Sequence, residues 1–130
     1  MSDNLRRYRA IRESLTQYYS VQISGRMAQH VTVLAAFING IVASKSSQLP
    51  KIATKIADRT KTESRIKRLS RWLDNPNVKA EIYFLPYAGV LLECLTLETL
   101  VLAMDGSTVG RGCCALMIHV IYKGRALPLG

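Results

Sequence analysis

The chain has few of the residues on which disulfide frameworks and metal sites are built. Among its 130 residues there are only three cysteines, two histidines and nine acidic residues. The cysteines, Cys94, Cys113 and Cys114, are odd in number and lack metal-ligand spacing, and neighbouring strand residues point to opposite faces. We therefore expect reduced thiols that serve as small apolar fillers in a cytoplasmic protein.

Long apolar segments are also lacking. The N-terminus is polar and basic and has no apolar run of the kind that marks a signal peptide. The longest apolar stretch, residues 31–43, is interrupted by Thr32, Asn39 and Gly40 and is too short to cross a bilayer. The sequence predicts a soluble protein with no membrane partner. Because 48% of its residues are hydrophobic, it can still form a core.

Acidic residues are scarce mainly in one part of the chain. Residues 1–80 hold 15 Lys and Arg against five Asp and Glu, whereas residues 81–130 hold three against four. The excess behind the net charge of +9 therefore lies entirely in the first part. Such a distribution is typical of a region that meets a polyanion, and it favours nucleic acid over a basic surface without a partner.

The first part of the chain has the periodicity of helices. Residues 5–19 are basic and loosely amphipathic, and residues 24–44 carry one apolar stripe. Pro50 suits the first turn of a further helix, and a helical pattern over residues 78–94 is broken near Pro86. The stripe of the second helix consists of Met27, Val31, Leu34, Ile38 and Ile41.

The best-marked helix follows Thr60 and Glu63, whose spacing predicts a capping box. Its apolar stripe is formed by Ile66, Leu69 and Leu73, with Trp72 at the edge and predicted to be core. Basic residues spread over the other side, where we expect contacts to DNA phosphates, which position a duplex without reading its sequence. These expected DNA-binding residues are Lys61, Lys67, Arg68 and Arg71.

Other basic and titratable residues leave alternatives open. Arg65 lies at the apolar border of the same helix, where packing along the Trp72 ring and a DNA contact are equally open. His30 and His119 have no partner spacing and are expected to be structural. A second basic patch, for which a solvated surface and a DNA contact are both open, consists of Arg6, Arg7, Arg9 and Arg12.

The periodicity changes near residue 100. Residues 100–104 predict a buried strand that carries Asp105 out of an apolar run, where an ionised carboxylate is costly unless it is paired, hydrogen-bonded or metal-bound. Residues 113–120 alternate two largely apolar sets, as in a strand covered on both faces. Lys123 and Gly124 predict a tight turn into a third strand. Since such a ribbon needs covering layers, we expect these residues to be the front portion of a longer protein.

Two segments point to a family. Residues 100–108 (LVLAMDGST) and 122–129 (YKGRALPL) closely resemble the start of the catalytic domain in DDE transposases of bacterial insertion sequences, and residues 59–77 are similar to the basic helical segment before that domain. The resemblance covers about residues 50–129. It implies a ribonuclease-H-like core in which three carboxylates hold two divalent ions. It also implies that Asp105 is the first of these carboxylates, a catalytic residue and a ligand of Mg²⁺.

We therefore expect an α+β chain with two parts. Residues 1–97 would form a helical, basic DNA-binding region, and residues 98–130 an incomplete ribonuclease-H-like domain. Because one carboxylate cannot hold two ions about 3.5–4 Å apart, strand cleavage and joining are implied for the full-length family and not expected of this fragment alone.

The expected function is that of a truncated transposase that binds DNA, at the terminal repeats of its element, for DNA transposition and recombination. One alternative is a regulator that inhibits transposition by occupying those ends, or by pairing with the full-length enzyme or a second copy of itself. The other alternative is a helical interaction module with no nucleic-acid role, whose basic face meets an acidic partner.

Overall fold

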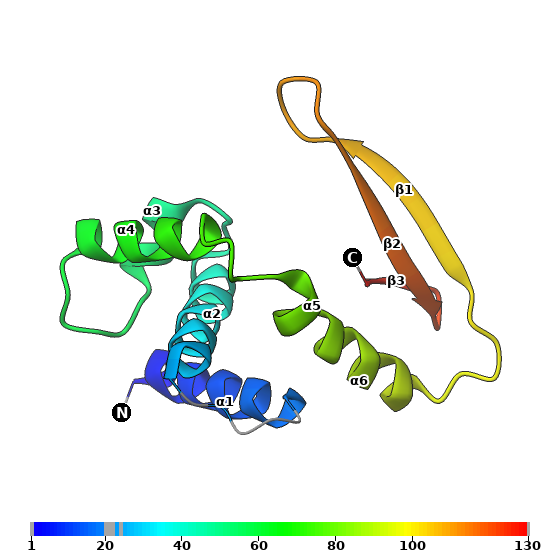
Figure 1. Cartoon of the computed structure of the whole chain (residues 1–130), viewed down its shortest axis with the longest axis horizontal. Helices are drawn as coiled ribbons and strands as arrows, with labels where there is room; N and C mark the ends of the chain where they lie inside the picture. The colour runs from blue at the N-terminus through cyan, green and yellow to red at the C-terminus, as the bar shows by residue number, and fades with distance from the viewer. Residues whose placement is uncertain (1, 20–22, 24, 130) are drawn as a thin grey trace. The chain divides into compact units, whose positions relative to one another are not determined.

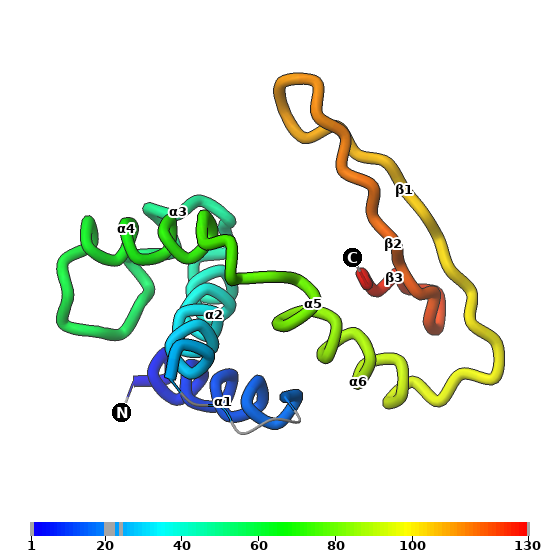
Figure 2. The backbone as a smooth tube through the Cα atoms, viewed as in Figure 1, coloured from blue at the N-terminus to red at the C-terminus, as the bar shows by residue number. Residues whose placement is uncertain are grey.

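The computed structural model describes residues 2–19, 23 and 25–129 (Figures 1 and 2). The chain forms two compact units, Met1–Pro86 and Tyr87–Gly130, which we call unit 1 and unit 2. Unit 1 is helical, whereas unit 2 combines most of one helix with an antiparallel sheet. The predicted α+β class is confirmed. The ribonuclease-H-like character of the sheet stays a prediction.

Helices make up the whole of unit 1 between its connecting loops. They are α1 (Asp3–Tyr18), α2 (Gly25–Ser44), α3 (Leu49–Thr54), α4 (Thr62–Leu73) and α5 (Ala80–Tyr83), and α6 (Leu85–Leu95) follows and continues into unit 2. Ser2 caps α1 by accepting a hydrogen bond from the backbone N–H of Leu5, and Pro50 lies in the first turn of α3 as predicted. The predicted break near Pro86 is confirmed, because α5 and α6 are separate helices.

The core of unit 1 is organised around α2, which contacts α1, α3 and α4 (Figure 2). One buried cluster joins α2 to α3 and α4 through Phe37, Ile52 and Leu69. A second cluster joins α2 to α1 and α5 through Val31, Leu15 and Tyr83. Because the two clusters lie on different sides of α2, this helix must be apolar over most of its circumference.

The apolar character of α2 needs one correction. This helix has 20 residues and, by length and composition, could cross a membrane, so it extends beyond the apolar stretch of residues 31–43 that the sequence indicated. Its buried residues nevertheless pack against other helices of unit 1, which identifies it as a core helix. The predicted stripe is confirmed except at Ile41, which is 42% exposed near the C-terminal end.

The predicted capping box of α4 is wrong. The helix begins at Thr62, its N-cap is Lys61, and no side chain caps it. The N–H and hydroxyl of Thr60 both donate to Oδ1 of Asp58, at 3.0 and 2.6 Å, so this hydroxyl is engaged before the helix begins. The core stripe holds for Ile66 and Leu69, but Leu73 at the end of the helix is 57% exposed.

Unit 2 contains a three-stranded antiparallel sheet in the order β1-β2-β3. The strands are β1 (Leu102–Thr108), β2 (Cys114–Tyr122) and β3 (Arg125–Pro128). The turn between β2 and β3 places Lys123 and Gly124 at φ values of 47° and 74°, the paired left-handed conformation of a two-residue hairpin turn. The predicted tight turn and third strand are therefore confirmed.

The strands of this sheet differ in burial: Val120 of β2 is buried, whereas most of β1 is exposed. Along β1 every residue except Ala103 is exposed, and Leu116 and Ile118 of β2 are 62% and 37% exposed. The three cysteines are free, as predicted, but all three are exposed and do not fill a core. Alternation of apolar residues identified the strands correctly, because it follows from the pleat, but it did not require a covering layer.

Candidate nucleic-acid interface

A hollow surface crosses unit 1 between α1, α2 and α4. One part is a cleft of about 640 Å³ whose lining includes Trp72 from α4 and Tyr8 from α1. A second hollow, of about 830 Å³, lies along α1 and α2. The two hollows share Tyr8, Ala28 and Thr32 and are therefore neighbours, and we call them together the α2 groove.

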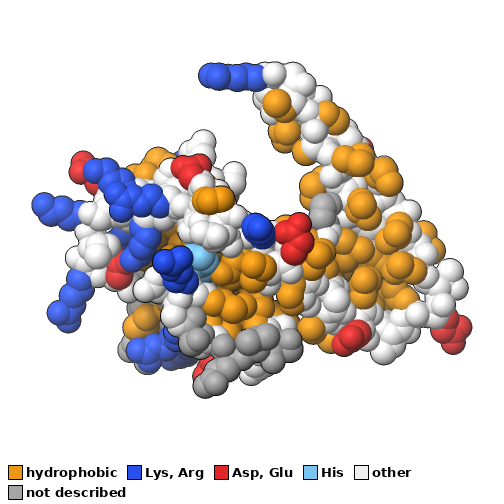
Figure 3. All heavy atoms as spheres, in the orientation of Figure 1, with side chains coloured by type: hydrophobic (Ala, Val, Ile, Leu, Met, Phe, Trp, Pro, Cys, Tyr) orange, Lys and Arg blue, Asp and Glu red, His pale blue; other side chains and the backbone are white. Residues whose placement is uncertain are grey.

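Arginines from two different helices line the α2 groove. Arg9 and Arg12 of α1 line one part of it, and Arg68 and Arg71 of α4 line the other. Figure 3 shows Lys and Arg side chains gathered over the helices of unit 1, whereas hydrophobic side chains cover much of the visible face of the sheet. Unit 1 carries 15 Lys and Arg against six Asp and Glu, and unit 2 carries three against three. The positive charge is thus concentrated in unit 1, and four of its arginines line the α2 groove.

The four predicted DNA-binding residues do not share one environment. Lys61, Lys67 and Arg71 are exposed, and none of them forms an ion pair within the described residues. Arg68 is partly buried, and its Nη2 donates to Oδ2 of Asp58 at 2.7 Å. Arg68 and Arg71 line the cleft, whereas Lys61 and Lys67 lie outside it on the same helix.

The second basic patch is anchored by hydrogen bonds between α1 and α2. Nε of Arg7 donates to Oδ1 of Asn39 at 2.9 Å, and Nε of Arg12 donates to Oγ1 of Thr32 at 3.2 Å. All four arginines of this patch remain exposed at the surface. These bonds fix the direction in which the Arg7 and Arg12 side chains leave α1, and both alternatives for the patch stay open.

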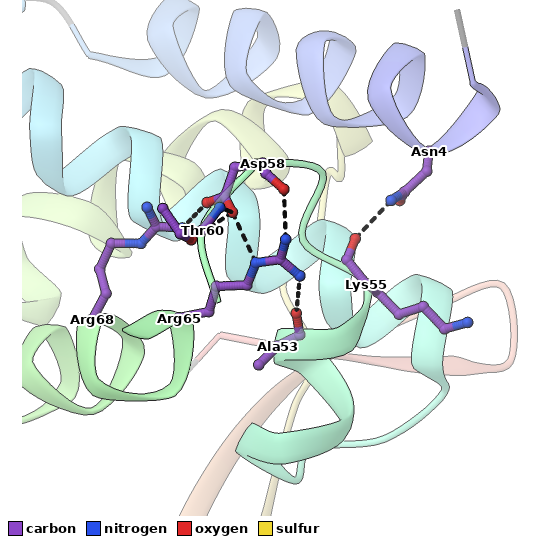
Figure 4. A network of polar contacts seen from close by, with 7 residues as sticks. All are labelled: Asn4, Ala53, Lys55, Asp58, Thr60, Arg65 and Arg68. Carbon is purple, nitrogen blue, oxygen red and sulfur yellow. Dashed lines mark hydrogen bonds and ion pairs between the residues drawn. The ribbon is translucent and has the colours of Figure 1, made fainter. Parts of the chain in front are cut away.

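Asp58 lies in the loop between α3 and α4 and binds side chains of that loop and of α4 (Figure 4). Its Oδ1 accepts from Nε of Arg65 at 2.8 Å and its Oδ2 accepts from Nη2 of Arg68 at 2.7 Å, in addition to the two bonds from Thr60. Partial burial alone would raise the pKa of Asp58, but the hydrogen bonds from Thr60, Arg68 and Arg65 outweigh it and hold the pKa well below its ordinary value. Asp58 is therefore ionised across the physiological range.

The same carboxylate decides the role of Arg65. All three guanidinium nitrogens of Arg65 donate, Nε to Oδ1 of Asp58, Nη2 to the Asp58 carbonyl and Nη1 to the carbonyl of Ala53 at 3.1 Å. Its side chain is 13% exposed. Arg65 is therefore a structural residue held by an ion pair, which was neither of the alternatives that the sequence left open.

Trp72 and His30 are structural, as predicted. The Trp72 ring lies 5.5 Å from that of Phe37, and its Nε1 donates to the carbonyl of His30 at 3.1 Å. Nδ1 of His30 lies 2.6 Å from the hydroxyl of Tyr83, whose pKa is raised by burial. These contacts connect α2, α4 and α5 and fix the wall of the cleft.

Two residues that organise this surface were missed at the sequence level. Asp58 was not singled out, although it is the only acidic residue among the basic ones of residues 51–62. Asn39 was noted only as an interruption of an apolar run, yet it is 1% exposed and donates from Nδ2 to Oδ1 of Asn4 at 2.7 Å. Asn4 in turn donates to the carbonyl of Lys55 at 2.6 Å, so that one buried amide joins α1 to the end of α3.

Asp105 lies in unit 2, in the middle of β1 and opposite Met117 of β2. Its position within the strand differs from the predicted end of an apolar run, because β1 continues to Thr108. Since Asp105 is exposed, the desolvation argument for a bound metal does not apply to it. Its assignment as a first catalytic carboxylate stays a prediction.

The described residues do not fit a Mg²⁺ site at Asp105. A two-ion centre requires several carboxylates within one small volume. Within residues 2–19, 23 and 25–129, no group of three or more His, Cys, Asp or Glu side chains comes together in a way that could hold a metal ion. We therefore derive no metal-dependent chemistry for this chain.

Comparison of the chain with protein-family models, with characterised proteins and with solved structures found no match.

Proposed function

We propose that unit 1 binds duplex DNA through phosphate contacts along the α2 groove, as the DNA-binding region of a protein of the DDE transposase type. In this proposal the protein acts in the cytoplasm on the terminal repeats of an insertion element. Binding to DNA is the activity proposed for this chain, and strand cleavage is not, because the resemblance assigns it only Asp105 of the three carboxylates that hold the two ions.

The observation that carries the proposal is the convergence of basic side chains from α1 and α4 on one groove. Arg9 and Arg12 line one part, Arg68 and Arg71 the other, and Lys61 and Lys67 extend the basic surface along α4. Since phosphates repeat along a duplex, a concave basic surface can contact several of them at once. A basic surface that served solubility alone would have no need of this convergence.

The acidic residues of unit 1 also support the proposal. Among the described residues, Asp58 is the only acidic one that lines the cleft, where its charge is shared by Arg65 and Arg68, and Glu13 lines the second hollow beside Arg9 and Arg12. The exposed Lys61, Lys67 and Arg71 have no ion-pair partner in the same part of the chain. Their charges are therefore ready to displace counterions from a phosphate backbone.

The test is the salt dependence of DNA affinity for the whole chain and for a triple variant, K61Q/K67Q/R71Q. Fluorescence anisotropy with a duplex of about 30 base pairs would give the dissociation constant between about 50 and 200 mM salt. Removal of one phosphate contact makes the log–log slope shallower by about 0.9. If all three side chains bind phosphates, the slope changes by about 2.7, and the wild type loses roughly 40-fold more affinity than the variant over this fourfold range.

The matched control removes the same charge from unit 2. The variant R111Q/K123Q/R125Q also loses three positive charges, from exposed positions in the two turns and at the start of β3. We expect it to keep the slope of the wild type. Equal changes of slope in the two variants would reduce the effect to net charge, and no affinity of the wild type for any duplex at about 50 mM salt would refute the proposal.

A further inference from the structure

The cleft within the α2 groove has features beyond those that phosphate contacts along a duplex need. Its volume of about 640 Å³ lies in the range of sites for small organic molecules. It is bounded by α1, α2, α4 and the segment after α3, all of which belong to unit 1. It is therefore a site within one compact unit.

One side of the cleft is apolar and rigidly held. Tyr8, Val33, Ile56 and Trp72 contribute hydrophobic and aromatic surface to it. The indole of Trp72 cannot turn away, because it packs on Phe37 and its Nε1 is hydrogen-bonded to the His30 carbonyl. A preformed aromatic wall of this kind suits a flat ring.

The other side of the cleft is cationic and incompletely satisfied. Arg68 and Arg71 are three residues apart on α4 and project from the same side of the helix. Nε of Arg68 is buried and has no hydrogen-bond partner among the described residues, although Nη2 of the same group is bound to Asp58. The Arg68 side chain as a whole is 41% exposed and lines the cleft, so its positive charge, and not the buried Nε, is available to an anion there.

Polar amides complete the lining. Gln29, Asn39 and Asn75 contribute both donors and acceptors, which can bind the polar edge of a heterocyclic ring. An apolar wall, two guanidinium groups and several amides together match a ligand that has a flat heterocycle and a phosphate.

We propose that this cleft binds a single nucleotide, with its base against Trp72 and its phosphate at Arg68 and Arg71. The nucleotide is either free or an unpaired residue of a DNA strand. The inference deepens the proposed function and depends on it only for the second of these sources, since a free nucleotide requires no DNA binding.

The chain reports on this site by itself, because Trp72 is its only tryptophan. Titration of the whole chain with deoxyadenosine 5′-monophosphate should change the Trp72 fluorescence and saturate. Deoxyadenosine and inorganic phosphate should each bind at least about tenfold more weakly, because each lacks half of the recognised chemistry. A single strand of six deoxyadenosines distinguishes the sources: tighter binding than the mononucleotide indicates DNA, and weaker binding indicates a free nucleotide.

Two variants test the position of the site. R71Q removes one phosphate ligand from an exposed position and should weaken mononucleotide binding about tenfold. A28L places a larger side chain at the cleft from the partly exposed Ala28 and should abolish the response, with circular dichroism confirming that the helices remain. K51Q, an exposed change on α3 outside the cleft, should leave the affinity unchanged.

The inference and the proposed function fail separately. If neither the mononucleotide nor the single strand changes Trp72 fluorescence saturably, while the duplex still binds with the expected salt dependence, the nucleotide site is refuted and DNA binding stands. If inorganic phosphate binds as tightly as the mononucleotide, the cleft is an anion site without base recognition, and the inference is equally wrong.

Discussion

Replacement of Asp58 by asparagine tests whether the ion pairs of Asp58 with Arg65 and Arg68 stabilise unit 1. The D58N variant keeps the size of the side chain and an oxygen that can accept from Thr60, but it loses both charge-assisted bonds. Bonds to charged groups contribute about 1.5–3 kcal/mol each. The Arg68 side chain is 41% exposed and regains solvation, whereas the Arg65 side chain is only 13% exposed and does not. We therefore expect a net loss of about 2–3 kcal/mol.

Thermal unfolding followed by Trp72 fluorescence measures this loss in unit 1, which contains both Asp58 and Trp72. For a unit of this size, 1 kcal/mol corresponds to about 4–8 °C in Tm, so D58N should unfold roughly 8–24 °C below the wild type. D74N is the matched control, because Asp74 is exposed at the C-cap of α4 and forms no ion pair within the described chain. It should change stability by less than about 0.5 kcal/mol.

The pH dependence checks the electrostatic cause. The folded-state pKa of Asp58 is depressed below its ordinary value of 3.8, so the folded state binds the proton more weakly than the unfolded chain. The stabilisation is therefore fully present above about pH 4 to 5 and is lost as the pH falls through and below 3.8. The difference between wild type and D58N should shrink over that acidic range. A difference that is equally large at acidic and neutral pH, or a D58N variant as stable as D74N, would refute the reasoning.

Three further changes test the packing and the buried polar groups of unit 1. G40A places a Cβ 2.5 Å from Cγ2 of Ile52, so urea unfolding should show a loss of about 1–2 kcal/mol despite the better helix propensity of alanine, and a gain would contradict the close packing of α2 on α3. N39A leaves Arg7 Nε and the Asn4 amide without their partner and should lose about 2 kcal/mol by the same assay; an unchanged midpoint would mean that water replaces the amide. Y83F removes the hydroxyl bound to His30 and should lose about 1 kcal/mol, with unchanged stability showing that this bond contributes nothing.

The parts of the fold that sequence patterns predicted are those fixed by local chemistry. Apolar residues spaced three or four positions apart predicted α2, and Pro50 predicted the start of α3. The Lys123-Gly124 pair located the β2–β3 turn, since its left-handed conformation depends on these two positions alone. Each of these signals lies within a few residues of the structure that it predicts.

The wrong predictions concern residues whose hydrogen-bond partners lie outside the helix to which the sequence pattern assigned them. The capping box of α4 failed because Asp58 binds both the N–H and the hydroxyl of Thr60 and the helix begins later. The role of Arg65 depends on a carboxylate seven residues earlier and a carbonyl twelve residues earlier, both across a loop. No periodicity predicts such a contact, since it requires the loop path between α3 and α4.

The DNA-binding role of the predicted site stays a prediction, and the sequence did not indicate how its residues are arranged. The sequence predicts one set of basic residues at and along α4, because charge and position along a helix follow directly from the sequence. The set consists of Lys61, Lys67, Arg68 and Arg71. That Arg68 faces Asp58 and that α1 provides the opposite wall could not be read from the sequence, because both depend on the packing of α2. In unit 2, the apolar alternation predicted the strands correctly, whereas what covers their faces stays a prediction, since a pleat determines faces and not what lies against them.

The arrangement of acidic residues on α4 strengthens the case for an external anion. Glu63 lies four residues before Lys67 and Asp74 lies three residues after Arg71, spacings at which helical ion pairs form. Among the described residues, however, neither pair forms, whereas the less exposed Arg65 and Arg68 share Asp58. Asp58 thus neutralises the partly buried Arg65 and Arg68. The exposed Lys61, Lys67 and Arg71 have no acidic ion-pair partner among the described residues. Repulsion among these outward charges is relieved when a polyanion binds, which is the condition that the proposed DNA complex would meet.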